Sequence, residues 1–161
     1  MVLGILLIVF LISRLFNLGI LPIFADEAIY IRWAQLINHG RILIPLSDGK
    51  TPLFMWLLAP LLRLGLDPLL TGRFLSVAAG LATLTGVYFL AKKLFSVKIA
   101  VISSFLVIVS PFLLFYDRIS LTDSLLTALI LWSVYITYQL FNRPSLKKGV
   151  ILGLLAGMVL L

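Results

Sequence analysis

The chain has 161 residues, of which 62% are hydrophobic and 12% are charged, whereas an average soluble domain is roughly 45–50% apolar and 25% charged. A soluble fold of this size would expose apolar patches well above the few hundred Å² that monomers tolerate, so the composition excludes a soluble domain and predicts an integral membrane protein. The formal charge of +7 comes with no cysteine and a single histidine, His39, which excludes disulfides, thiolate sites and a multi-histidine metal site within the chain.

The first apolar run, residues 2–21, predicts a transmembrane helix, because about 20 residues span a hydrocarbon core of roughly 30 Å. Arg14 lies within this span, close enough to its outer end to snorkel outward or to meet a carboxylate. No basic region precedes the run, and Phe24-Ala25 is not preceded by an A-x-A site. We therefore expect an uncleaved anchor and not a removed signal peptide.

The segment from residue 22 to residue 70 carries eight charged side chains and cannot be embedded in lipid throughout. Within it, residues 27–38 place apolar side chains on one helical face and polar ones on another. This pattern predicts a helix that lies along the membrane surface and ends at His39-Gly40. The apolar run 53–64 is too short to span and contains a proline, so it predicts a second interfacial or re-entrant helix with Pro52 near its start.

Three further transmembrane helices are predicted over residues 71–91, 99–115 and 123–141. A short polar turn, residues 116–122, joins the last two. A fifth apolar run, residues 149–161, has about 13 residues, fewer than the roughly 17 that a span needs, so we expect the chain to be a truncated N-terminal part of a larger transmembrane domain. The predicted fold class is an all-α polytopic bundle with interfacial helices in the first outer loop.

The positions of the basic residues predict the orientation of the bundle. Two short gaps follow the spans 71–91 and 123–141 and hold Lys92, Lys93, Lys98, Arg143, Lys147 and Lys148. The positive-inside rule makes these gaps and the N-terminus cytoplasmic, and it makes 22–70 and 116–122 outer. Basic residues in such gaps do not form the wettable, aromatic-interleaved surface that strand-binding proteins present, so nucleic acid is excluded as a partner.

Among the charged side chains of the predicted outer face, those that could carry chemistry are Asp26, Glu27, Asp48, Lys50, Asp117, Arg118 and Asp123. Carboxylates from two loops, with a lysine and an arginine beside them, are suited to surround an anionic substrate at the bilayer surface. A carboxylate acts as a base, and cations neutralise the charge on a departing phosphate.

Each of these residues also has a purely structural interpretation. Asp26 is an ordinary N-cap for the first surface helix, and Asp123 with Thr122 is an ordinary N-cap for the span that follows. Lys50 and Arg118 fit the role of interfacial anchors. Capping and catalysis are not exclusive, because a cap on a rigid helix is also well positioned, and spacing alone leaves both interpretations open.

Several short motifs follow one another along nearly the whole chain: Arg14-Leu-Phe, Phe24-Ala-Asp-Glu-Ala-Ile-Tyr30, Lys50-Thr-Pro-Leu-Phe-Met-Trp56, Gly72-Arg-Phe-Leu-Ser76, Ala91-Lys-Lys-Leu-Phe95, Ser110-Pro111 and Arg118-Ile-Ser-Leu-Thr-Asp123. Each motif is weak by itself. The ordered set, with matching helix lengths between its members, resembles the N-terminal part of polytopic GT-C glycosyltransferases. The relevant members are bacterial and archaeal relatives of protein O-mannosyltransferases and lipid A aminoarabinose transferases.

The resemblance implies an enzyme that takes a sugar from a polyprenyl-phosphate carrier and places it on a lipid, protein or glycan acceptor at the outer face of the cell membrane, usually with inversion. Asp26 matches the family's catalytic aspartate, which positions or deprotonates the acceptor. Lys50 matches a lysine that contacts the carrier phosphate. Arg118 and Asp123 match the second outer-loop motif, as a phosphate partner and an acidic site residue.

The chain departs from the family pattern in two respects. The usual Lys-Pro-Pro, sometimes preceded by a glutamate, is here Asp48-Gly-Lys50-Thr-Pro52, so a metal or donor role for the acidic position is in question. Asp48 and Glu27 are kept as candidate substrate- or phosphate-binding residues, and a requirement for a divalent metal ion is left open. Family members also normally carry more spans and often a C-terminal outer domain.

Two other classes of function are open to the sequence. A transporter or channel subunit would be expected to carry charges or broken helices at the membrane midplane, and the sequence predicts neither. A small structural or assembly membrane protein would use its charges only as caps and anchors.

Overall fold

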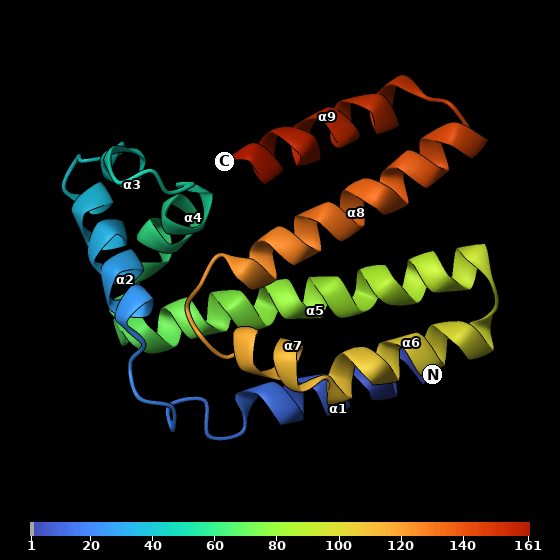
Figure 1. Ribbon diagram of the computed structural model, residues 1–161, viewed down its shortest axis with the longest axis horizontal. Coiled ribbons are helices and arrows are strands. Elements are labelled where there is room, and N and C mark those ends of the chain that lie inside the picture. Colours follow the sequence, from blue (N-terminus) through green and yellow to red (C-terminus); the bar gives the residue numbers. More distant parts are fainter. Residues whose placement is uncertain (1) are drawn as a thin grey trace.

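The computed structural model describes residues 2–161, and within that range it consists of helices and connecting turns, with no strand (Figure 1). The predicted all-α fold is confirmed. In chain order the helices are α1 (Val2–Leu15), α2 (Ala25–Asn38), α3 (Ile44–Ser47), α4 (Leu53–Leu62), α5 (Pro68–Leu94), α6 (Val97–Val109), α7 (Pro111–Tyr116), α8 (Asp123–Asn142) and α9 (Leu146–Leu160).

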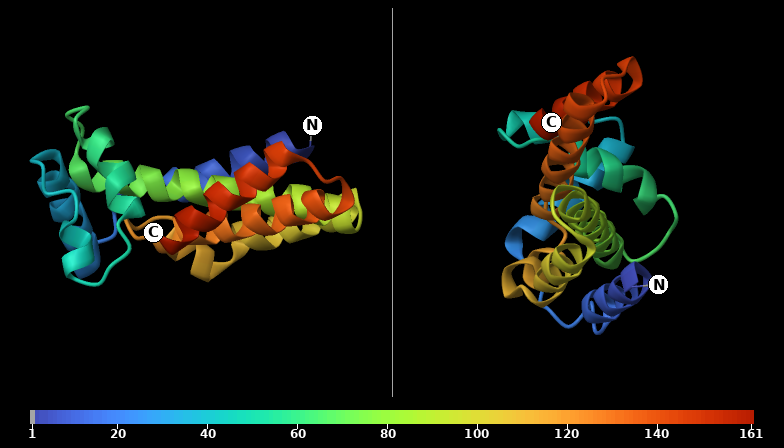
Figure 2. Two further views of the ribbon diagram at one scale, coloured as in Figure 1. Left: turned by 90° about the horizontal axis from the view of Figure 1, so that it is seen from above. Right: turned by 90° about the vertical axis from the view of Figure 1, so that its right-hand side faces the viewer.

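Helix α5 is the centre of the bundle (Figures 1 and 2). Helices α1 and α6 pack against it on one side and α8 packs on another, while α9 lies along α8. Helices α5 and α8 run in one direction, and α1, α6 and α9 run in the other. Small residues let the neighbours approach α5 closely, because a Cβ at Gly72, Gly80 or Gly86 would collide with a side chain of the turn before α8 or of α8 itself.

Helices α5 and α8, with 27 and 20 residues, are long and apolar enough to cross a membrane, and α1, α4 and α6 are shorter apolar helices. The predicted first span, 2–21, is helical only as far as Leu15, because Asn17 adopts a left-handed conformation (φ 49°) and the chain turns there. The predicted span 99–115 is divided between α6 and α7. Pro111 has no N–H with which to continue α6, and it begins α7 instead.

The segment between α1 and α5 folds into α2, α3 and α4, which gather at one end of the bundle (Figure 1). Helix α2 ends before His39-Gly40, as predicted, and Gly40 supplies the left-handed residue (φ 88°). Helices α2 and α4 share a hydrophobic cluster with the turn before α8, made by Tyr30, Ala34, Phe54, Met55, Leu58, Ala59, Ile119 and Leu121. This cluster fixes the surface helices against the bundle.

The two ends of the bundle differ in charge, because one holds carboxylates and cations in similar numbers and the other holds cations alone. All six carboxylates of the chain belong to the segment 26–67 or to the turn 117–123, which lie toward the end formed by α2 and α4, here called the acidic end. The opposite end, here called the basic end, holds the α5–α6 and α8–α9 connections with six lysine and arginine side chains, as well as the start of α1. The orientation of these ends in a membrane stays a prediction.

Candidate active site at the acidic end of the bundle

The first turn of α2 presents two adjacent carboxylates with different surroundings. Phe24 is the N-cap, so the N-cap role predicted for Asp26 is wrong, and Asp26 is the second residue of the helix. The helix is instead capped by Glu27, whose Oε2 accepts a hydrogen bond from the Phe24 N–H at 3.0 Å. Within residues 2–161 the half-buried carboxylate of Asp26 makes no hydrogen bond or ion pair. Its oxygens are therefore available to a ligand.

Glu27 forms a fully buried ion pair with Arg73 of α5. Arg73 Nη2 lies 2.9 Å from Oε2 and Nε lies 3.0 Å from Oε1, and neither side chain is exposed to solvent. The Ser120 N–H donates to Oε1 at 2.7 Å. With the bond from Phe24, all of the roughly four acceptor positions of a carboxylate are filled. The substrate-binding role predicted for Glu27 therefore finds no support in this geometry.

The remaining donors of Arg73 hold the connection between α1 and α2. Its Nη1 and Nη2 donate to the carbonyl oxygens of Leu18, Leu21 and Pro22 at 2.9–3.2 Å. Burial raises the pKa of the Glu27 carboxyl, but the hydrogen bonds from Arg73 and from the two backbone N–H groups outweigh it and hold the pKa below its ordinary value. Glu27 is therefore ionised, and its charge joins three segments that are distant in sequence.

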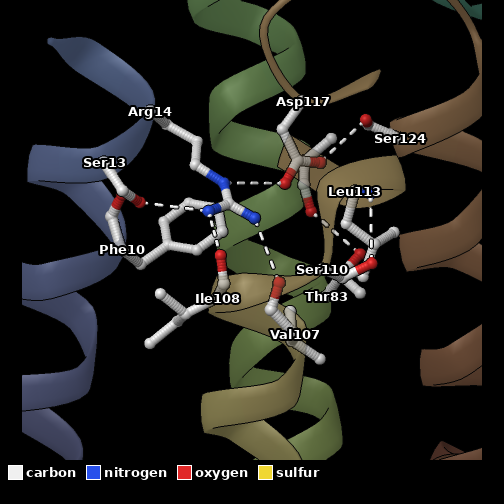
Figure 3. Close-up of polar contacts among 11 residues, drawn as sticks. Phe10, Ser13, Arg14, Thr83, Val107, Ile108, Ser110, Leu113, Asp117 and Ser124 are labelled. Carbon is white, nitrogen blue, oxygen red and sulfur yellow. Dashed lines mark hydrogen bonds and ion pairs between the residues drawn. The ribbon is translucent and has the colours of Figure 1, made fainter. Parts of the chain in front are cut away.

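The turn between α7 and α8 is fixed by a second buried ion pair, shown in Figure 3. Arg14 Nε of α1 lies 3.2 Å from Asp117 Oδ2, and the Ser124 hydroxyl of α8 donates to Asp117 Oδ1 at 2.9 Å. Arg14 also donates to the carbonyl oxygens of Ile108 and Val107 at the end of α6, at 2.6 and 3.1 Å. The sequence-based expectation that Arg14 snorkels or meets a carboxylate is thus resolved in favour of Asp117.

Asp123 is the first residue of α8, and its carboxylate is exposed. Thr122 is the N-cap and makes no side-chain capping bond, so the capping pair predicted from Thr122 and Asp123 is not formed. Asp123, like Asp26, has no side-chain hydrogen bond or ion pair in the part of the chain that the structure describes. Both helix N-termini therefore leave a carboxylate without a partner.

Tyr30 connects the two carboxylates electrostatically. Burial raises the pKa of its phenol, and the charges of Asp26 and Asp123 raise it further, so both carboxylates lie within electrostatic range of one hydroxyl. The bond from Ser120 to Glu27 explains this proximity, because it ties the start of α2 to the turn that leads into Asp123. The first turns of α2 and α8, which carry Asp26 and Asp123, are thus held at the same end of the bundle.

The two cations predicted to bind phosphate differ in exposure, because Lys50 is exposed and Arg118 is half-buried. Lys50 and Asp48 are exposed in the loop between α3 and α4, and no bond of their side chains to Asp26 or Asp123 is present among residues 2–161. Arg118 is half-buried, and its Nη2 donates to the carbonyl oxygens of Phe16 and Asn17 at 2.9 and 2.8 Å. Its buried Nε has no hydrogen-bond partner in the described chain.

Arg73 and Ser120 lie within two of the motifs quoted from the sequence, but sequence reasoning assigned neither residue a role. The sequence did indicate that Arg73 needs a partner, because an arginine inside the predicted span 71–91 lies in lipid, where water does not solvate its charge. Ser120 acts through its backbone N–H, which its side-chain type does not reveal. In the region 2–161 no group of three or more histidine or acidic side chains is arranged to hold a metal ion.

A sequence model described as dolichyl-phosphate-mannose-protein mannosyltransferase matches residues 49–161. The matched range includes Lys50, Arg73, Arg118 and Asp123, whereas Asp26 lies before it. Comparison with curated proteins and with solved structures gives no match.

Proposed function

The chain belongs to the dolichyl-phosphate-mannose-protein mannosyltransferase family, and on that premise we propose that it moves a mannosyl or related sugar from a polyprenyl-phosphate carrier to an acceptor at the outer face of the cell membrane. Family membership and the apolar helices give a membrane glycosyltransferase. The identity of the sugar, the class of acceptor (protein, lipid or glycan) and the location of the site at the outer face go beyond family membership and are proposed here.

The observation that carries the proposal is the pair of carboxylates without protein partners, Asp26 and Asp123, on the first turns of α2 and α8. Glu27 and Asp117 are buried and are satisfied by protein donors, as buried polar groups normally are. Asp26 and Asp123 instead lie on the first turns of two helices that a hydrophobic cluster and a buried ion pair hold in place. Such rigid placement is what a group in an active site requires.

Asp26 is proposed to be the general base. It accepts the proton of the acceptor hydroxyl while that oxygen forms a bond to the anomeric carbon, and the bond from the anomeric carbon to the phosphate oxygen breaks. The electron pair of the broken bond stays on the polyprenyl phosphate. Asp123 is proposed to orient the acceptor or the sugar hydroxyls. A positioned base of this kind typically contributes 10²–10⁴-fold to the rate.

Charge on the departing phosphate is proposed to be neutralised by Lys50 and Arg118. Lys50 is exposed and its ammonium is not committed to another group of the described chain, so it is free to meet a phosphate. Arg118 uses Nη2 for backbone carbonyls and keeps its Nε without a partner. Cations aimed at the developing negative charge stabilise the transition state more than the ground state.

The test uses membranes that contain the protein expressed from its complete reading frame and a panel of radiolabelled polyprenyl-phosphate sugars. We expect the wild type to transfer label to an acceptor and Asp26→Asn to lose at least about 100-fold of that rate. Asp67→Asn is the matched control. Asp67 caps α5 through its side chain, which asparagine also does, so this variant should keep full transfer.

Each negative result has a defined meaning. Transfer retained by Asp26→Asn would refute the assigned base. No transfer by well-folded wild type with any donor in the panel would refute the transferase and favour a transporter subunit or a structural membrane protein.

A further inference from the structure

A polar pocket opens at the basic end of the bundle, far along the helices from Asp26 and Asp123. It has a volume of about 560 Å³ and lies where the last turns of α5 and α8 meet the first turn of α9. Three of its lining residues are cations, Lys93, Arg143 and Lys148, and the polar groups among the others include Tyr135, Gln139 and Asn142.

The cations of this pocket have no carboxylate to pair with. The two ion pairs found within residues 2–161, Arg14–Asp117 and Arg73–Glu27, both lie elsewhere, and all six carboxylates of the chain belong to segments toward the acidic end. Lys148 Nζ is held at the pocket by the carbonyl oxygens of Gln139 and Arg143, at 3.2 and 2.8 Å. Three positive charges that share one concave surface repel one another, and an anion bound among them removes that repulsion.

An apolar groove continues from the pocket between α8 and α9. The groove has a volume of about 720 Å³, and Ile130, Val134, Phe141 and Leu160 are among the apolar residues that line it. Tyr138 lines both the groove and the pocket, so the two adjoin at this residue. A ligand that fills both must combine an anionic head with an apolar tail.

We propose that this pocket binds the phosphate headgroup of an anionic phospholipid of the surrounding membrane, with its acyl chains in the groove between α8 and α9. The location agrees with the chemistry, because basic pockets between transmembrane helices at the ends of the helices are suited to lipid phosphates. The donor and acceptor proposed above meet at the other end of the bundle, so this lipid is a separate ligand.

The test measures lipid adducts of the full chain in a non-ionic detergent by native mass spectrometry, with added phosphatidylglycerol or phosphatidylcholine. We expect phosphatidylglycerol to bind and phosphatidylcholine to bind much more weakly. Each cation close to an anionic lipid is worth about fivefold in affinity, so the double variant Lys93→Gln/Arg143→Gln should bind phosphatidylglycerol about 25-fold more weakly. Both side chains are exposed, so the fold should not change, and circular dichroism checks this.

The matched control is Lys98→Gln/Lys147→Gln, which removes the same charge from exposed residues at the same end that do not line the pocket. It should weaken binding by about fivefold or less. Equal effects of the two double variants, or equal binding of the two lipids, would overturn the proposal. Complete displacement of the lipid by inorganic phosphate in millimolar excess would also overturn it, because the pocket would then be a free-anion site without a role for the acyl chains.

Discussion

Replacing Glu27 by glutamine removes the negative charge from a side chain that is fully buried and accepts four hydrogen bonds. The substitution leaves the guanidinium of Arg73, also fully buried, without a counter-charge. Breaking a buried ion pair by removing one partner typically costs about 3–5 kcal/mol, and we expect Glu27→Gln to lower the free energy of unfolding by this amount. Arg73→Met should cost a similar amount, because it leaves the Glu27 charge with only two N–H donors.

The double variant Glu27→Gln/Arg73→Met separates the ion pair from the rest of the network. It leaves no unpaired charge in the interior, and the amide oxygen introduced at position 27 can still accept from the Ser120 N–H. We therefore expect the double variant to lose about as much stability as one single variant, and not the sum of the two. The resulting coupling energy should be about 3 kcal/mol, within the range found for residues of one network.

The free energies are measured by unfolding the chain in mixed micelles with increasing sodium dodecyl sulfate, with helix content followed by circular dichroism. Asp67→Asn serves as the control, because its side chain is exposed and asparagine keeps the cap, and it should change stability by less than about 0.5 kcal/mol. If the losses of the two single variants add to within about 0.5 kcal/mol in the double variant, the coupled, buried pair is refuted.

Two further predictions concern the same polar framework. Gly80→Ala should destabilise the fold by about 1–3 kcal/mol, because the new Cβ would meet the carboxylate of Asp117, whereas Gly153→Ala meets no atom within 4 Å and should be neutral or stabilising in the same unfolding assay. The folded-state pKa of Glu27 is below its ordinary value of 4.5, so its stabilisation is complete above that pH and is lost as the pH falls through the folded-state value. Wild type should therefore lose stability below about pH 4.5 more steeply than the Glu27→Gln/Arg73→Met variant, and equal acid profiles would contradict this assignment.

The predicted helices were recovered most accurately where a local signal ends them. Gly40 ends α2 because glycine adopts a positive φ without a steric cost, and Lys92-Lys93 fall in the last turn of α5. The first span was predicted too long, because apolar composition continues past Leu15 while the backbone already turns at Asn17. Hydropathy indicates which segments partition into lipid, but it does not indicate where the helical hydrogen bonds end.

In the candidate site, too, the sequence predicted some features and the tertiary structure decided others. Sequence patterns selected Asp26, Glu27 and Asp123 as outer carboxylates but assigned them similar chemistry. The tertiary structure separates them, because Arg73 and two backbone N–H groups saturate Glu27, while Asp26 and Asp123 keep their oxygens free. Adjacent residues on a helix point in directions about 100° apart, so two neighbouring carboxylates can have opposite surroundings.

The sequence by itself determined the helical membrane class and the confinement of the carboxylates to two segments of the chain, because both follow from composition and order. Only the tertiary structure decided the partners of the buried charges. Arg14 meets Asp117 across 103 positions and Arg73 meets Glu27 across 46, and such contacts depend on how α5 packs against its neighbours. A charge that leaves water must find a counter-charge in space, and its distance along the chain does not matter to that requirement.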